Sequence, residues 1–313
     1  MALRNMRIWR YIDEVARIGS VRQAAERLHV TPSAVLRRIQ DVETDLGATL
    51  FERTAAGVQL TAVGEIFVRW IRSQDADLRR VYSQIEELSG LRRGEVRVAC
   101  SQAVADSFLL DEIVDFRTRH PLVSFSVTVL DHGGAIKALS KYETDIVLVF
   151  GPPRSAELQP IMSLGQRLVA VMSSDHPLAA QPSLRLRDCA LYNVALPDRN
   201  FGGRKIIDDL LSSSSTRLNV AFETNSFDML CNFVRQTDAI TFQIEIGVLR
   251  WAKDPRIAIR PIDDADLAHG PLVLGQLKGR ALPIAEAKFA EQLARRLDEL
   301  RTLPMASAVR QPD

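Results

Sequence analysis

Cysteine is scarce in this sequence, which contains only three such residues among 313. Cys100, Cys189 and Cys231 are odd in number and far apart, so they form neither a disulfide framework nor the spacing of a metal site. We therefore expect buried, unreactive thiols and a cytoplasmic protein, because free cysteines are usual in a reducing compartment.

Long apolar runs and an excess of one charge are also absent. No stretch approaches the ~18 consecutive apolar residues of a membrane-spanning helix, and charges are scattered through the N-terminus, where a signal peptide would have an apolar core. The sequence has 40 basic and 39 acidic residues and a formal net charge of +1. This balance gives no sign of a globally basic nucleic-acid binder, although a local basic face is compatible with it.

Common enzyme motifs are missing too. The chain has no GxGxxG dinucleotide motif, no Walker A phosphate loop, no HExxH zinc motif and no GxSxG nucleophile motif. Gly202-Gly203-Arg204-Lys205 resembles a phosphate loop only superficially, because the leading glycine and the Ser or Thr are lacking. We expect a protein that is not an enzyme and that uses no cofactor and no metal.

What the sequence does contain is a helix-turn-helix pattern between Ser20 and Leu60. A short helix is predicted over residues 21–28 from apolar residues on one face. A second helix begins with Thr31 as N-cap and Pro32 at its first position, and Gly47 ends it. The apolar face predicted for this second helix consists of Val35, Ile39, Val42 and Leu46.

The opposite face of the second helix is polar and basic. It carries Ser33, Arg37, Arg38 and Gln40. Side chains at the start of such a helix can reach base edges in the major groove, while Ser33 and free N–H groups can hold phosphate and arginine can read guanine. The pattern favours DNA binding, and the alternative is an ordinary helical core with a solvated face.

The segment AAERLHVTPSAVLRRIQDVETDLGATLFERTAAGVQLTAVG resembles the N-terminal signature of the LysR-type transcriptional regulators almost position for position. The resemblance implies that the start of the second helix faces DNA and that Arg53 and the tip around Gly57 form a wing beside the minor groove. The predicted DNA contacts are Arg22, Thr31, Pro32, Ser33, Arg37, Arg38, Arg53 and Gly57.

Two positions depart from the pattern of that family. Leu36 stands where a small polar residue is usual, which puts one DNA contact in doubt. Ala55-Ala56 stand at a wing tip that is often basic, which suggests fewer phosphate contacts.

Two further helices flank the helix-turn-helix. Residues 4–18 are predicted to form a helix that Gly19 ends. A long helix is predicted from Thr61 to about Leu88, and a heptad row along it is typical of pairing with a second copy. The row consists of Phe67, Ile71, Gln74, Leu78, Val81, Ile85 and Leu88. Packing within its own domain is the alternative, whereas the resemblance implies dimerisation, and we expect dimers that pair into a homotetramer.

After Gly94 the sequence alternates between strands and helices, which is typical of a parallel sheet with right-handed crossovers. Strands are predicted over residues 95–100, 123–130, 145–150, 167–172, 192–196, 218–223, 239–242 and 271–277. Helices are predicted over residues 108–119, 134–142, 203–211, 226–236 and 285–300.

The predicted fold is an all-α winged helix-turn-helix DNA-binding domain with a long linker helix, plus an α/β two-lobed effector domain that resembles periplasmic binding proteins. The expected limits are 1–62 for the DNA-binding domain, 63–89 for the linker helix, 90–94 for a hinge, 95–302 for the effector domain and 303–313 for a disordered tail. Its first lobe would comprise residues 95–163 and 266–302, and its second lobe residues 164–265.

Effector contacts are predicted at the carboxyl ends of the strands, where open α/β sheets bind ligands. The nominated residues are Ser101, Gln102, Asp131, Phe150, Pro197, Asp198, Asn225 and Gln243. For Ser101 and Asn225, capping of a helix is an equally good explanation.

These patterns together predict a sequence-specific DNA-binding transcriptional regulator that a small-molecule effector modulates. The expected partners are double-stranded promoter DNA, a small-molecule effector and further copies of the chain, with RNA polymerase as a further candidate and no membrane. The competing classes are a solute-binding module and an enzyme, and the helix-turn-helix argues against the first of them because a pure binding module has no use for it.

Overall fold

The computed structural model of the protein describes residues 2–55, 57–88, 93–152, 155–199, 204, 207, 208, 211, 212, 216–263 and 271–302. The predicted tail over 303–313, most of the predicted hinge over 90–94 and most of the predicted helix over 203–211 lie outside these residues. The chain divides into two compact units, Met1–Tyr82 and Ser83–Asp313.

The N-terminal unit has the helices and the wing that the sequence predicts. Its elements are α1 (Ala2–Ile18), α2 (Val21–Arg27), α3 (Pro32–Leu46), β1 (Phe51–Thr54), β2 (Gly57–Leu60) and the part of α4 (Ala62–Leu88) up to Tyr82, where the unit ends. The backbone N–H of Ala34 donates to the Oγ1 of Thr31 at 3.3 Å, which confirms Thr31 as the N-cap of α3. Gly47 ends α3 in a left-handed conformation, with φ of 66°.

The core of this unit gathers apolar residues from its helices and from the wing. Its buried members are Ile12, Val15, Ala24, Ala25, Val35, Ile39, Leu50, Val68 and Ile71. Val42 is partly buried against them, whereas Leu46 is 44% exposed. The apolar stripe predicted along α3 was therefore wrong at Leu46, because the last turn of the helix runs past the edge of the core.

Gly57 holds the wing against the loop between α1 and α2. The two wing strands are antiparallel, with Thr54 opposite Gly57. The backbone N–H of Val58 donates to the carbonyl oxygen of Gly19 at 2.8 Å. Gly57 has φ of +128°, and a Cβ added to it would lie 2.6 Å from that same oxygen. Glycine is thus required here for the backbone conformation and for the close approach.

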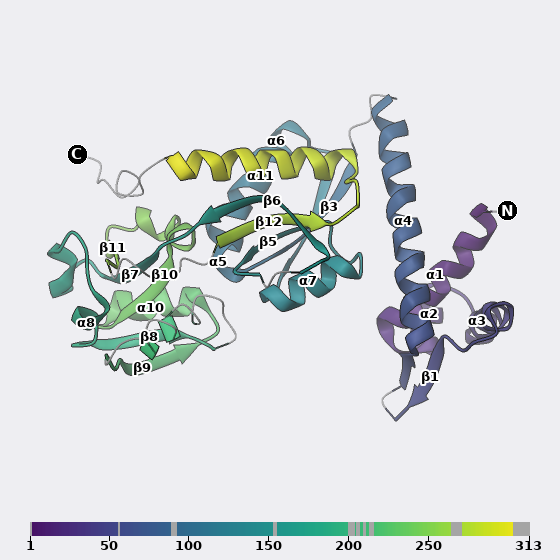
Figure 1. Ribbon diagram of the computed structural model, residues 1–313, viewed down its shortest axis with the longest axis horizontal. Coiled ribbons are helices and arrows are strands. Elements are labelled where there is room, and N and C mark those ends of the chain that lie inside the picture. The colour runs from purple at the N-terminus through teal and green to yellow at the C-terminus, as the bar shows by residue number, and fades with distance from the viewer. Residues whose placement is uncertain are drawn as a thin grey trace. The chain divides into compact units, whose positions relative to one another are not determined.

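The C-terminal unit contains two five-stranded sheets, and each forms the centre of one lobe (Figure 1). In the first lobe the strand order is β4-β3-β5-β12-β6, and in the second it is β11-β7-β10-β8-β9. The first sheet consists of β3 (Gly94–Cys100), β4 (Val123–Val129), β5 (Ile146–Phe150), β6 (Leu158–Gly165) and β12 (Pro271–Leu277). The second consists of β7 (Leu168–Ser173), β8 (Asn193–Pro197), β9 (Asn219–Thr224), β10 (Ile240–Ile244) and β11 (Ile257–Pro261).

Both sheets are mixed, so the expectation of purely parallel sheets was wrong. Strand β12 runs antiparallel to β5 and β6, and β7 runs antiparallel to β10 and β11. Strands β6 and β11 were not predicted from the sequence. Strand β6 contains Pro160, and β11 ends at Pro261. Both strands lie at a sheet edge, where the missing N–H of proline costs no ladder hydrogen bond.

Helices cover both faces of the first sheet. The helical segments of the unit are α5 (Gln102–Val104), η1 (Ala105–Leu109, π-helical), α6 (Leu110–Arg119), α7 (His132–Ser140), η2 (Pro177–Ala180), α8 (Leu186–Cys189), α10 (Phe227–Gln236), η3 (Glu245–Val248), η4 (Trp251–Lys253) and α11 (Ile284–Thr302). Phe116 of α6 and Phe289 of α11 share one core with β3, while Leu139 of α7 packs with Val147 of β5 in another. Figure 1 shows α11 lying along this lobe.

The three cysteines are free and buried, as predicted. Burial raises the pKa of Cys100 and of Cys231 to about 12, so both are unreactive thiols at neutral pH.

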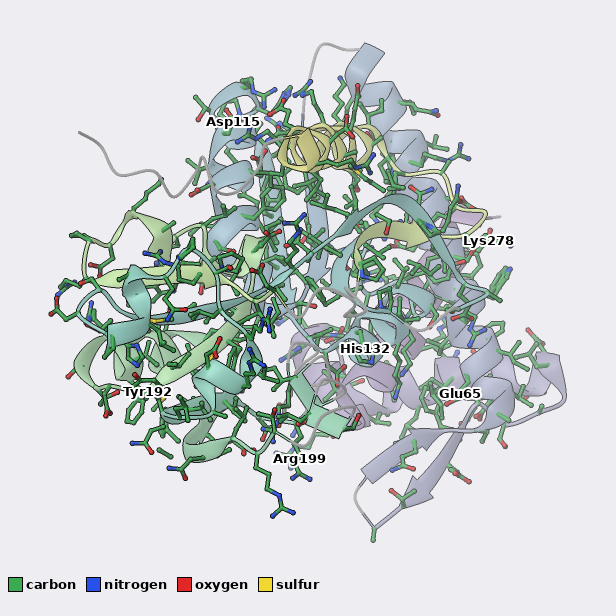
Figure 2. All side chains as sticks on the ribbon, turned by 60° about the vertical axis from the view of Figure 1, so that its left-hand side comes forward. Glu65, Asp115, His132, Tyr192, Arg199 and Lys278 are labelled. Carbon is green, nitrogen blue, oxygen red and sulfur yellow. The ribbon has the colours of Figure 1, made fainter. Side chains whose placement is uncertain are left out.

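Charged side chains lie on the outside of the C-terminal unit, Asp115, Arg199 and Lys278 among them (Figure 2). Of the helices in the described ranges, none has the length and apolar character that a membrane span requires.

Candidate functional site

The exposed face of α3 lies opposite the two residues that anchor the helix in the core. Val35 and Ile39 are buried, while four side chains on the other side are exposed. These four are Ser33, Leu36, Arg37 and Gln40. They follow the three- and four-residue spacing of a single helix face, so an exposed surface of mixed chemistry is presented in one direction.

The start of α3 supplies groups that can hold a phosphate. The hydroxyl groups of Thr31 and Ser33 lie 3.2 Å apart, and both residues are exposed beside Pro32. Pro32 has no N–H and that of Ala34 already donates to Thr31, so the two hydroxyl groups and the helix dipole are what make this end favourable for an anion.

The basic residues nominated for DNA contact differ in their surroundings. Arg38 pairs with Asp41 at 3.2 Å and Arg22 pairs with Glu26 at 3.2 Å, in both cases on exposed surface. Such pairs are weak, so DNA phosphate can compete with them. Arg37 is exposed beside Leu36, and Arg53 is exposed on strand β1 of the wing.

The residues of the row predicted for dimerisation differ in burial along the length of α4. Phe67 and Ile71 belong to the core of their own unit, and Ile71 is only 4% exposed. Val81 and Ile85 near the other end are 43% and 52% exposed. Near the start of α4, the apolar side chains that face solvent are Ile66 and Trp70. Each of them lies one residue before a position of the predicted row. The side chain of Leu88 lies outside the described residues.

In the first lobe, several residues nominated for effector contact instead make hydrogen bonds or core contacts within the lobe. Ser101 does not cap α5, since its Oγ accepts a hydrogen bond from the backbone N–H of Phe150 at 3.2 Å and so joins β3 to β5. Asp131 caps α7 by accepting from the N–H of Gly134 at 2.6 Å. Phe150 itself is 5% exposed and belongs to the core.

In the second lobe, nominated residues likewise make hydrogen bonds within the lobe or lie beside the residue that caps a helix. Ser226, rather than Asn225, caps α10. The carbonyl oxygen of Pro197 accepts from Nη1 of Arg204 at 2.9 Å, and the N–H of Asp198 donates to the carbonyl oxygen of Thr224 at 2.9 Å.

Arg204 is a buried cation whose charge is balanced nearby. Its side chain is 7% exposed and lies 2.8 Å from Asp208 and 3.3 Å from Glu223. Burial alone would lower the pKa of Arg204, but the two carboxylates raise it above its ordinary value. The guanidinium therefore stays charged and holds the carbonyl of Pro197.

Among the nominated residues, Gln102 and Gln243 line one pocket together. The pocket lies between the lobes, and its empty volume of about 360 Å³ includes the open solvent at its mouth. The first lobe supplies residues of α5 and η1, and the second supplies residues of α10, β10, η3 and η4. Its lining consists of Gln102, Ala103, Asp106, Ser107, Phe227, Asp228, Gln243, Gly247, Arg250 and Trp251.

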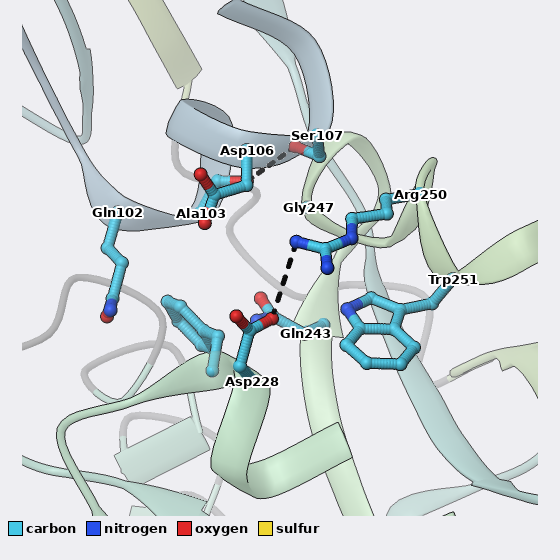
Figure 3. A pocket seen from close by; sticks show the side chains of 10 residues that line it. Gln102, Ala103, Asp106, Ser107, Asp228, Gln243, Gly247, Arg250 and Trp251 are labelled. Carbon is cyan, nitrogen blue, oxygen red and sulfur yellow. Dashed lines mark hydrogen bonds and ion pairs between the residues drawn. The ribbon is translucent and has the colours of Figure 1, made fainter. Parts of the chain in front are cut away.

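The polar groups of the pocket face one another across it (Figure 3). Nη1 of Arg250 lies 3.7 Å from Oδ1 of Asp228, and its guanidinium lies 5.5 Å from the centre of the Trp251 ring. The amide oxygen of Gln102 is buried and accepts no hydrogen bond from any described residue. The amide oxygen of Gln243 accepts from the N–H of Ile244 at 3.2 Å.

Comparison with known proteins assigns both units. The family described as "Bacterial regulatory helix-turn-helix protein, lysR family" matches residues 6–65, and the family described as "LysR substrate binding domain" matches residues 89–298. The chain belongs to the LysR family. It is a transcriptional regulator with a DNA-binding helix-turn-helix domain and an effector-binding domain, rather than an enzyme.

Individual relatives agree with this assignment. The chain is 29% identical over 279 residues to the HTH-type transcriptional regulator CbbR of Rhizobium meliloti. This alignment covers 89% of each chain. A full-length OxyR variant from Pseudomonas aeruginosa has the same fold, with a TM-score of 0.70, 19% identity and 98% of each chain covered. Full-length CbnR solved in complex with its target DNA gives a TM-score of 0.60 at 21% identity, over 93% of this chain and 99% of that one.

Sequence reasoning missed most of the pocket of this LysR-type regulator. Asp106 and Ser107 lie on a π-helical turn, and Gly247, Arg250 and Trp251 lie on or beside short 3-10 segments. None of these elements has the length over which a hydrophobic period can be recognised. The one available signal was the position of α5 and η1 directly after the first strand.

Proposed function

We propose that this LysR-type regulator binds promoter DNA as a dimer through α3 and the wing, and that an effector held between the lobes changes this binding. The observation that carries the proposal is the exposed face of α3, where hydroxyl, amide and guanidinium groups lie opposite a fully buried anchor. Hydroxyl and backbone N–H groups fix the position of a helix on the phosphates, and side chains further along read the bases.

Arg37 is the first residue to test. Its guanidinium is exposed at the second turn of α3, where a recognition helix contacts base edges. Replacing Arg37 by alanine is expected to weaken specific DNA binding by ~1–3 kcal/mol, the usual worth of a good arginine–guanine contact. Fluorescence anisotropy of the full-length protein on labelled upstream DNA, at one fixed salt concentration, measures the effect.

Arg17→Ala is the matched control for this substitution. Arg17 lies at the end of α1 and pairs with Glu14 on the surface, so its loss should leave DNA affinity within twofold. Equal affinities of the Arg37 variant and of wild type would contradict the placement of α3 in the groove.

Self-association is proposed to proceed through α4. Val81 and Ile85 near its end are 43% and 52% exposed, and a second copy of the helix would cover them. Paired recognition helices then face successive major grooves about 34 Å apart. We propose further that dimers pair into tetramers, that the protein acts in the cytoplasm, and that RNA polymerase is a candidate partner because it meets a regulator at the promoter.

The proposed effector site is the pocket between the lobes. Its buried Gln102 oxygen lacks a hydrogen-bond donor within the described structure, and a buried acceptor of this kind is costly unless it is satisfied. A ligand that donates to this oxygen and contacts the second lobe would favour one arrangement of the lobes. Such differential affinity is what allows an effector to change DNA binding.

Gln102→Leu tests the pocket, since leucine has a comparable size and no acceptor. A thermal-shift screen of the full-length protein against a metabolite library identifies ligands, because a ligand that binds the folded state raises the unfolding temperature. For a ligand found in this way, the variant is expected to bind about tenfold more weakly, as for the loss of one hydrogen bond, measured by isothermal titration calorimetry.

Gln159→Leu is the control, because Gln159 is exposed on edge strand β6 and does not line the pocket. It should bind the ligand as wild type does. Wild-type affinity in the Gln102 variant would show that the effector binds elsewhere.

A further inference from the structure

Leu36 interrupts the polar face of α3. It is 37% exposed, and it lies within one helical turn of Ser33, Arg37 and Gln40. Single exposed leucines are common on protein surfaces and need no explanation by themselves. This leucine, however, lies on the face that the proposed function places against DNA, where an exposed side chain would contact the DNA.

The core does not require an apolar residue at this position. The buried and partly buried side chains of the N-terminal core include Val35, Ile39 and Val42 from α3, and Leu36 is not among them. Leu36 thus lies outside this core, and more than a third of its surface is exposed in the free protein.

The chemistry of leucine leaves few partners in a major groove. Its side chain has neither a donor nor an acceptor, so it can bind neither phosphate oxygen nor the polar edges of the bases. In unmodified DNA the thymine C5-methyl group is the apolar feature that the base edges present in that groove. Covering a polar edge with leucine would remove water without replacing its hydrogen bonds.

We propose that Leu36 is a specificity-determining residue that contacts a thymine methyl group beside the base read by Arg37. The inference rests on the proposed placement of α3 in the major groove, and it adds an apolar requirement at one base pair in each half-site. Arg37 is its neighbour in sequence and on the helix face, so the two side chains would read adjacent positions on the DNA.

The test removes the methyl group from the DNA alone. A duplex site is selected from random-sequence DNA with the full-length wild-type protein, and each thymine in it is replaced singly by deoxyuridine. One replacement in each half-site is expected to weaken wild-type binding about fourfold, the value for one buried methyl group. In Leu36→Ala the same replacement should change affinity by less than about 1.5-fold, because the apolar partner is absent.

Leu46→Ala is the matched control. Leu46 is an exposed leucine of the same helix, at 44%, and lies in its last turn beyond Leu36, Arg37 and Gln40. This variant should keep the wild-type response to deoxyuridine, and circular dichroism should show helix content unchanged in both leucine variants.

The outcomes separate the two proposals. Equal responses of wild type and Leu36→Ala at every thymine, or a selected site without thymine in its half-sites, would overturn the role of Leu36 while DNA binding stands. Failure of the wild-type protein to select any sequence would overturn both proposals together. A thymine response lost only in Leu36→Ala would establish the contact.

Discussion

Replacing Asp145 by alanine is expected to destabilise the C-terminal unit by about 3–5 kcal/mol, the usual cost of removing one partner from a buried ion pair. The carboxylate is fully buried and forms ion pairs with two guanidinium groups. Nε and Nη2 of Arg97 donate to its two oxygens at 2.9 and 2.8 Å, and Nη2 of Arg280 lies 2.8 Å from Oδ1.

The expected cost is large because both arginines depend on this carboxylate. Arg280 is 9% exposed, and its guanidinium also lies 5.5 Å from the centre of the Tyr142 ring. Burial alone would lower the pKa of Arg97, yet the hydrogen bonds and charge of Asp145 raise it. Without the carboxylate, two cations would face each other with little water to screen them.

The cluster also joins strands that are distant in sequence. Arg97 lies on β3, Asp145 immediately precedes β5, and Arg280 follows β12. These three strands are neighbours at the centre of the first sheet. Loss of Asp145 would therefore loosen the sheet that carries one side of the proposed effector pocket.

Urea unfolding of the full-length protein, followed by circular dichroism, measures the effect. Asp115→Ala is the matched control, since Asp115 forms an exposed pair with Arg119 at 2.7 Å and should cost less than about 1 kcal/mol. Asp145→Asn keeps one acceptor oxygen without the charge and should lie between the two. Equal stabilities of Asp145→Ala and Asp115→Ala would show that the buried cluster contributes nothing to stability.

Local signals allowed the N-terminal unit to be predicted closely. Thr31, Pro32 and Gly47 fix the ends of α3 through their own side-chain and backbone chemistry, and these effects act within four residues. The same locality explains the error at Leu46. Periodicity identifies an apolar face, but the extent of the core beneath it depends on α1 and α4, whose buried residues such as Ile12 and Val68 are distant along the chain.

The row along α4 illustrates a second limit. Heptad spacing correctly predicted that α4 is long and apolar along one side, but it did not separate the turns that pack within the unit from those that face solvent. Ile71 is buried beside Val68, whereas Trp70 is 43% exposed. A helix rotates its face gradually relative to a strict seven-residue repeat, so successive turns can serve different partners.

The proposed effector pocket was the least predictable part. The rule that ligands bind at carboxyl ends of strands located the region, as Gln102 and Gln243 show. It could not tell that Asp131 would cap a helix or that Phe150 would be buried in the core. Those outcomes depend on which loops converge, and Arg250 and Trp251 reach the pocket only through the packing of the two lobes.

Aspartates at positions 81 and 85 of α4 are expected to convert the protein to monomers. In the proposed dimer, Val81→Asp combined with Ile85→Asp removes four apolar side chains from the shared seam, each worth ~1.5–3 kcal/mol, and brings like charges together. Because both side chains are already about half-buried in the monomer, the expected loss of association free energy is about 3 kcal/mol or more. Sedimentation velocity at micromolar concentration measures it, and specific DNA affinity should fall at least 100-fold in parallel because two half-sites can no longer be bound together.

Adjacent positions on α4 supply the control for this experiment. Ile85 and its neighbour Gln84 are both exposed, but only Ile85 falls on the heptad row. Ile85→Asp alone should weaken the dimer at least tenfold, while Gln84→Asp, which adds the same charge beside the seam, should change it by less than about threefold. A double variant that still sediments as wild type does would show that α4 is not the surface of self-association. Equal effects of the substitutions at positions 84 and 85 would show that charge, rather than the apolar seam, governs dimerisation.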